Sequence, residues 1–217
     1  MRIQNLAPFI VVFIAGTSVG LYAVLKSGEH YLNEKPARQV SDAPPANPEL
    51  APLWDSPDFT LTNQQGGETS ERDLRGHVWI SDFIFTQCGG SCPVMTAKMA
   101  RLQKEIADPS VKLVSFSVDP DHDTPALLKA YGQKYQADFS RWSFLCSPGH
   151  KAIWDVAKGM KITAEASDQQ DQILHSDRFL LTDADGHVRG VYDSADDRAM
   201  TRLAADALKL SSQHKPG

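Results

Sequence analysis

Residues 78–93 read VWISDFIFTQCGGSCP, and this stretch decides how the chain folds. Its first half, residues 78–85, is almost wholly apolar, which is typical of a central strand buried on both faces. The Gly-Gly loop that follows, with Pro93 at an expected first helical position, predicts a turn from strand to helix. Such a turn brings the sulfurs of Cys88 and Cys92 to a helix N-terminus, where unpaired N–H groups and the helix dipole favour the thiolate. The stretch therefore predicts metal or redox chemistry at a strand-to-helix turn.

Further strand and helix patterns surround this turn. Residues 111–118 predict a second central strand, and Met95, Met99 and Leu102 follow one stripe of a helix over residues 93–106 that we expect to face the core. A copper-binding methionine motif is the alternative interpretation of that stripe. Other elements are expected at 125–136 (a helix capped by Thr124), 142–146 (strand), 148–160 (helix), 173–182 and 187–192 (a hairpin around Asp183-Ala184-Asp185-Gly186) and 195–210 (helix). This order predicts an α/β fold, a thioredoxin-like sandwich in which a mixed central sheet carries helices on both faces.

The size and charge of the chain limit its class. Its 217 residues have room for one membrane anchor and one globular domain of about 160 residues. The formal net charge of -5 argues against a nucleic-acid partner, because phosphate binding requires a basic surface.

The N-terminal region predicts a membrane anchor. Leu6–Leu25 is a stretch of 20 residues without charge, flanked by Arg2 and Lys26, and a helix needs about 20 such residues to cross a bilayer. A cleaved signal peptide is the alternative interpretation. We expect a bacterial inner membrane protein with a single span and its domain in the periplasm. The expected parts are a tail and transmembrane helix (1–26), a Pro-rich tether (27–52), the thioredoxin-like domain (53–212) and a polar tail (213–217).

Cys88 and Cys92 are spaced to bind one ion together. Soft thiolates select copper(I) or zinc over magnesium or calcium. Two sulfurs leave an ion with too few ligands, and His175 is the best candidate for a third because it opens the expected hairpin, whose strand we expect near the cysteine loop. Two thiolates and one imidazole suit a trigonal copper(I) site.

Three segments together resemble the SCO/SenC family. They are the Cys88-x-x-x-Cys92-Pro93 loop, the segment from Val118 to Thr124 (VDPDHDT) and Leu174-His175-Ser176 before the hairpin. The resemblance spans about Trp54 to Leu210 and also includes the anchor. It implies a membrane-tethered copper metallochaperone that delivers copper to the copper A centre of cytochrome c oxidase, reduces the thiols of that centre, or does both.

The resemblance also implies roles for residues and partners. Cys88, Cys92 and His175 become the ligands of copper(I), with copper(II) left open, and Asp119 and Asp123 lie in an acidic loop with a role in partner docking or in supporting the ligands. The implied partners are the copper A subunit of the oxidase or another copper acceptor, and an upstream copper donor.

Other interpretations of these residues stay open. The cysteine pair could form a structural disulfide, or serve a thiol-disulfide oxidoreductase, although those enzymes typically have two residues between the cysteines and this chain has three. A peroxidase of the peroxiredoxin type fits less well. Asp123 could cap the next helix, His122 is expected to be a solvated loop residue, and Cys146, which departs from the family pattern, is expected to be buried and inert.

Overall fold

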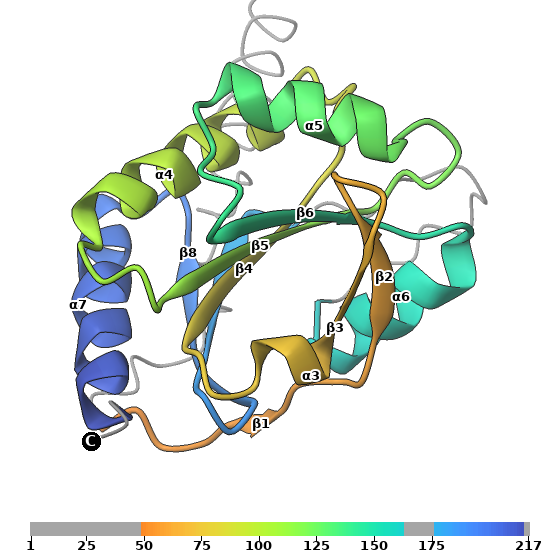
Figure 1. Cartoon of the computed structure of the whole chain (residues 1–217). Coiled ribbons are helices and arrows are strands. Elements are labelled where there is room, and N and C mark those ends of the chain that lie inside the picture. Colours follow the sequence, from red (N-terminus) through yellow and green to blue (C-terminus); the bar gives the residue numbers. More distant parts are fainter. Residues whose placement is uncertain (1–48, 163–175, 215–217) are drawn as a thin grey trace, which may run out of the picture. The chain divides into compact units, whose positions relative to one another are not determined.

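A mixed sheet of eight strands organises the described residues, 49–162 and 176–214, of this computed structural model (Figure 1). The strands follow the order β1-β8-β7-β4-β5-β6-β2-β3. Their bounds are β1 Trp54–Asp55, β2 Thr60–Asn63, β3 Glu68–Ser70, β4 Trp79–Ile84, β5 Lys112–Ser117, β6 Trp142–Cys146, β7 Arg178–Thr182 and β8 His187–Asp193.

The centre of the sheet consists of the parallel strands β4, β5 and β6. All six residues of β4 are buried, as expected of a strand covered on both faces. On one side, β7 pairs antiparallel with β4 and forms a hairpin with β8, whose turn contains Gly186 at a φ of 80°. On the other side, β2 joins β6 and forms a hairpin with β3. The strands predicted at 78–85, 111–118 and 187–192 and the hairpin turn around Gly186 are confirmed, and β6 has the predicted bounds. The strand predicted at 173–182 begins at Arg178, and its first three residues lie outside the described residues.

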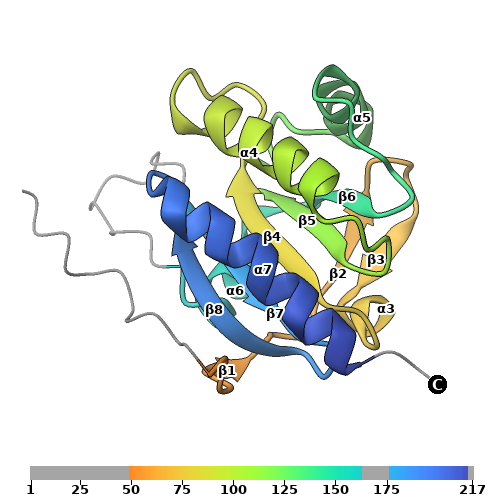
Figure 2. The ribbon, with the colours of Figure 1, turned by 90° about the vertical axis from the view of Figure 1, so that its left-hand side faces the viewer.

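Helices lie on both faces of this sheet. They are α3 Glu71–Leu74, α4 Ser91–Glu105, α5 Pro125–Lys134, α6 His150–Gly159 and α7 Asp197–Gln213. Figure 2 shows α4 and α7 side by side across one face, and these two helices are in contact. Helix α5 packs beside β6, and α6 lies on the opposite face. The predicted α/β architecture with a mixed sheet is therefore confirmed.

Local sequence signals explain where α5 begins and which face of α4 is buried. The hydroxyl of Thr124 accepts a hydrogen bond from the backbone N–H of Leu127 at 3.3 Å and caps α5, which confirms the predicted cap. The predicted stripe of α4 is buried, with Met95 and Leu102 each 1% exposed and Met99 fully buried. The stripe is therefore part of the core.

The fold begins ahead of the first strand. Leu50, in the segment that the sequence assigns to the tether, is only 1% exposed and belongs to the core. The backbone N–H of Leu53 donates to the carbonyl of Val188 at 2.9 Å, which ties this segment to β8. Among residues 49–162 and 176–214, no helix is both long enough and apolar enough to cross a membrane. The predicted span Leu6–Leu25 lies outside the described residues.

Candidate functional site

The two cysteines lie on the loop from β4 to α4, as predicted. Gly90 caps the helix, so Cys92 is the second helical residue and Pro93 the third. The prediction of Pro93 at the first position was therefore wrong. A proline is tolerated here because the first N–H groups of a helix have no partner within the helix. All three cysteines of the chain are free thiols.

Cys88 is the activated thiol of the pair. Its partial burial raises the pKa, but hydrogen bonds from the backbone N–H and the thiol of Cys92 and from the N–H groups of Gly90 and Ser91 outweigh this, so the pKa lies below the ordinary 9.0. The Gly90 N–H lies 3.4 Å from the sulfur. The start of α4 therefore stabilises the thiolate of Cys88, as the sequence predicted.

Cys92 behaves differently from Cys88. It is 4% exposed, and burial, followed by the hydrogen bond to Cys88 and the negative charges of Cys88 and Asp82, raises its pKa to about 12, although the Phe85 N–H acts in the opposite direction. The expectation that the helix start favours both thiolates was wrong for Cys92, because desolvation outweighs the helix dipole at this position. The pair thus combines one thiol that ionises readily with one that keeps its proton.

Asp123 holds the cysteine loop to the end of β5. Its carboxylate accepts hydrogen bonds from the backbone N–H of Thr86 at 3.1 Å and from the Thr86 and Ser117 hydroxyls, each at 2.5 Å. Asp123 is 3% exposed and Ser117 1%, so the bond between them is shielded from water, whereas Thr86 is half-buried. The alternative that Asp123 caps α5 was wrong, because Thr124 is the cap. Sequence reasoning missed Thr86 and Ser117, which gave no signal beyond their place at the ends of strands.

Asp119 organises the same acidic loop from within. Its backbone carbonyl accepts from the N–H of Asp123 at 2.9 Å, and its carboxylate lies 2.9 Å from the Nδ1 of His122. That hydrogen bond, followed by the charge of Asp119, raises the pKa of His122. The His122 side chain is 58% exposed, which agrees with a solvated loop residue. Asp119 and Asp123 therefore both shape the loop beside the cysteines.

The remaining predicted residues have separate outcomes. Cys146 is 5% exposed, its sulfur contacts the carbonyl of Thr62 at 3.6 Å, and burial raises its pKa. The prediction of a buried thiol is confirmed. His175 lies outside the described residues, so its role as a third ligand stays a prediction.

Asp82 is a site residue that sequence reasoning missed. It lies in the middle of β4, is fully buried, and affects the pKa of Cys92 through its charge. An acidic residue inside an otherwise buried strand was the signal that could have identified it, since such a carboxyl is seldom buried without a reason.

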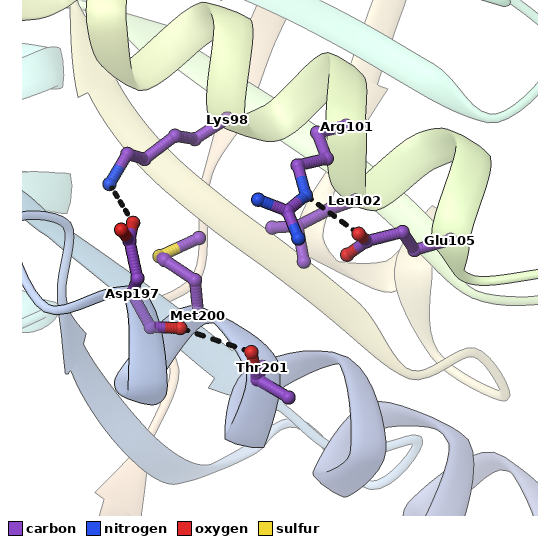
Figure 3. A pocket seen from close by; sticks show the side chains of 7 residues that line it. All are labelled: Lys98, Arg101, Leu102, Glu105, Asp197, Met200 and Thr201. Carbon is purple, nitrogen blue, oxygen red and sulfur yellow. Dashed lines mark hydrogen bonds and ion pairs between the residues drawn. The ribbon is translucent and has the colours of Figure 1, made fainter.

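Two other features of the described residues do not belong to this site. A cavity of about 20 Å³ between α4 and α7 is lined by the ion pair Lys98–Asp197, which joins the two helices, and by the ion pair Arg101–Glu105 within α4 (Figure 3). No cysteine lines it. Asp183, Asp185 and His187 could group around an ion, but one oxygen of Asp183 accepts the N–H groups of the other two residues, as in an ordinary hairpin turn.

Comparisons with known proteins identify relatives of this chain. The SCO1/SenC family model matches residues 52–209. A curated relative, the SCO1 protein homolog of Bacillus subtilis, is 35% identical over 178 residues, which cover 81% of this chain and 88% of the relative.

Two solved structures share the fold. BsSco, a member of the Sco family of cytochrome c oxidase assembly proteins in which a disulfide switch was identified, has a TM-score of 0.66 and 34% identity, covering 75% of this chain and 96% of its own. Bradyrhizobium japonicum ScoI with copper bound has a TM-score of 0.60 and 22% identity, covering 72% and 99%. Because the family model covers most of the sequence and the B. subtilis relative is 35% identical over 81% of it, this chain belongs to the SCO1/SenC family.

Proposed function

We propose that this protein is a copper metallochaperone that takes part in the assembly of cytochrome c oxidase. The observation that carries the proposal is the pair of free thiols at the start of α4, one activated and one buried, on a loop fixed by Asp123. Adjacent sulfurs are soft donors that suit copper(I). The relative that is described with copper bound and the relative that is described as an oxidase assembly protein support the same function.

The asymmetry of the two thiols suits capture followed by release. Cys88 bonds first to incoming copper(I), because its lowered pKa lets it lose its proton more readily than Cys92 does. Cys92 bonds second, once its proton has left, and His175 completes a trigonal set. Transfer then proceeds by ligand exchange, in which the thiols of the acceptor replace Cys88 and Cys92 one at a time.

The setting of this chemistry is part of the proposal. Leu6–Leu25 anchors the chain in the bacterial inner membrane, and the domain faces the periplasm. The acceptor is the copper A subunit of the oxidase or another copper protein, and an upstream donor supplies the metal. Asp119 and Asp123 act on the ligands through the loop that they shape.

Metal titration of single variants tests this proposal. The reduced full-length chain in detergent, kept anaerobic, should bind one copper(I), and Cys88→Ser, Cys92→Ser and His175→Ala should each lose tight retention against a competing chelator. Cys146→Ser is the matched control, since it removes the buried thiol on β6, and it should bind like the parent. If all three ligand variants retained copper(I) as tightly as the parent, the ligand assignment would be wrong.

The second candidate function is thiol-disulfide exchange with partner proteins. The contrast between the pKa values of Cys88 and Cys92 favours it, since an attacking and a resolving thiol have this division of properties. Disulfide-reductase turnover, measured on the same sample as the metal stoichiometry, separates the two functions. Rapid turnover without copper uptake would establish exchange in place of metal delivery.

A further inference from the structure

Helix α6 turns one basic and aromatic face toward solvent. Lys151, Trp154 and Lys158 follow the spacing i, i+3 and i+7, which places them on one side of the helix. All three are exposed, whereas Ile153 and Val156 of the same helix are buried. The core therefore holds the inner side of α6, and the outer face, formed by Lys151, Trp154 and Lys158, is open to a partner.

Trp154 is the largest of the exposed hydrophobic side chains among the described residues, with an exposed fraction of 51%. Its ring meets the ring of His150 edge-on, with the two centroids 5.8 Å apart. The Nε2 of His150 lies in turn 3.0 Å from a carboxylate oxygen of Asp121. The indole is thus steadied at the surface of the helix. Indole rings are enriched where a bilayer meets water, because they join an apolar body to a polar N–H.

The charge of this face is opposite to the charge of the whole chain. Lys151 and Lys158 flank Trp154 along the helix, and Lys161 follows the end of the helix. Asp155 is the one acidic residue between positions 150 and 161, and it forms an exposed ion pair with Lys151 at 2.6 Å, which is easily opened. The chain as a whole has a formal net charge of -5. An indole between lysines is complementary to a surface that is anionic outside and apolar beneath, which describes a bilayer with acidic headgroups.

The C-terminal end of α6 lies beside the point where the N-terminal segment enters the domain. The Nζ of Lys161 is 4.5 Å from the centroid of the Trp54 ring, and Trp54 begins β1. The neighbouring Leu53 is 39% exposed. Residues 27–48 can span at most about 75 Å when fully extended. An anchor at Leu6–Leu25 therefore keeps the domain within reach of the bilayer and raises the effective concentration of lipid at this face.

We propose that the outer face of α6 docks on the anionic surface of the membrane that anchors the chain. Lys151 and Lys158 contact the phosphate groups of the lipids, and Trp154 enters the boundary between headgroups and acyl chains. The inference rests on the anchor of the proposed function and goes beyond it by stating which side of the domain meets the membrane. Helix α4, which carries Cys92, covers the other face of the sheet, so docking through α6 leaves that helix uncovered (Figure 2).

Quenching of tryptophan fluorescence by brominated lipids tests the docking in the full-length chain. None of the four tryptophans lies in Leu6–Leu25, and Trp79 and Trp142 are buried, so lipid contact is reported by Trp54 and Trp154. The chain is reconstituted in vesicles of brominated phosphatidylcholine with or without phosphatidylglycerol. The quenching that Trp154→Phe removes belongs to Trp154. This part should be present with phosphatidylglycerol, and it should fall when that lipid is left out or the salt concentration is raised.

Charge reversal separates docking from chance contact. Lys151→Glu combined with Lys158→Glu keeps Trp154 and should lower the docking constant at least about 25-fold, at about fivefold for each lysine near an anionic surface. The matched control, Lys104→Glu combined with Lys129→Glu, makes the same change of charge at exposed positions of α4 and α5 and should be quenched like the parent. Trp154 quenching that is unchanged in the α6 variant, or equal with and without phosphatidylglycerol, overturns the proposal. No Trp154 quenching in either vesicle also overturns it and assigns the face to a protein partner.

Flotation distinguishes a failed anchor from failed docking. At high salt and with phosphatidylcholine alone, charge attraction is screened, so flotation of the chain with the vesicles reports the anchor alone. A chain that does not float refutes the anchor of the proposed function. A chain that floats but shows no quenching of Trp154 with phosphatidylglycerol keeps the anchor and refutes the docking.

Discussion

The buried Asp82 makes the stability of the fold depend on pH. Its pKa rises from the ordinary 3.8 to about 7 on folding, chiefly because burial disfavours the charged form. Below 3.8 the carboxyl is neutral in both the folded and the unfolded chain and imposes no penalty. As the pH rises toward 7, the unfolded chain ionises first, so the free energy of unfolding falls until the folded chain ionises as well.

The magnitude follows from the two pKa values. At about 1.36 kcal/mol for each pH unit that separates them, the full penalty above pH 7 is about 4 kcal/mol. The part of it that develops between pH 5 and pH 8 is roughly 2.5 kcal/mol. Asp82→Asn keeps the size of the side chain but cannot ionise, so it should gain this amount relative to the parent over that range.

Urea unfolding at several pH values provides the assay. The fluorescence of Trp79 and Trp142, which are at most 1% exposed, should report loss of the core. The change with pH is the informative quantity, because the buried amide of the variant has a desolvation cost of its own that does not vary with pH. If the free energies of unfolding of parent and variant differ by the same amount at pH 5 and at pH 8, Asp82 does not titrate as a buried, uncompensated carboxyl, and the reasoning is wrong.

Three further predictions concern the loop and the packing around the site. Asp123→Ala leaves the buried Ser117 hydroxyl and two half-buried donors of Thr86 unpaired and should destabilise the domain by about 3 kcal/mol in urea unfolding. A loss well under 1 kcal/mol would contradict the stabilising role of these hydrogen bonds. Gly132→Ala places a Cβ 2.8 Å from two Phe rings and should lower the free energy of unfolding by about 1–3 kcal/mol. The same change at an uncrowded helix position stabilises a protein, so a higher free energy of unfolding in this variant would refute the close packing at Gly132. Asp119→Asn should lower the pKa of His122 toward the ordinary 6.5, measured by NMR titration of the His122 ring. In the parent, the stability that this pair contributes should be lost as the pH rises through the raised pKa of His122. An unchanged pKa of His122 in the variant would contradict the hydrogen bond to Asp119.

The sequence predicted those parts of the fold that depend on local patterns. Each of these parts has a local sequence signal that predicts it without knowledge of tertiary contacts: an apolar run for the strand at 79–84, the Thr124 cap for the start of α5, and Gly186 for the hairpin turn. The position of the thiol pair followed from the same signals.

What the sequence did not predict depends on burial and on distant contacts. Cys88 and Cys92 share one helix start, yet their pKa values move in opposite directions because only one of them is enclosed by the core. Asp123 bonds to Thr86, which is 37 positions away, and no periodicity reports such a contact. Asp82 appeared to be part of a strand, and its chemical setting became visible only with the neighbouring strands in place.

The strand order also places the N-terminal edge of the sheet, where a pulling force on the preceding chain would act, two strands away from β4 and the cysteine loop. Strand β1, the described element nearest the N-terminus, is an edge strand held by only two residue pairs, Trp54 with Val188 and Asp55 with His187. Strands β8 and β7 stand between it and β4. A force that pulls on the chain ahead of residue 49 first meets the buried Leu50, whose carbonyl accepts from the Arg189 side chain of β8, and then β1 at the edge of the sheet. The edge strand can yield while the loop that carries Cys88 keeps its shape.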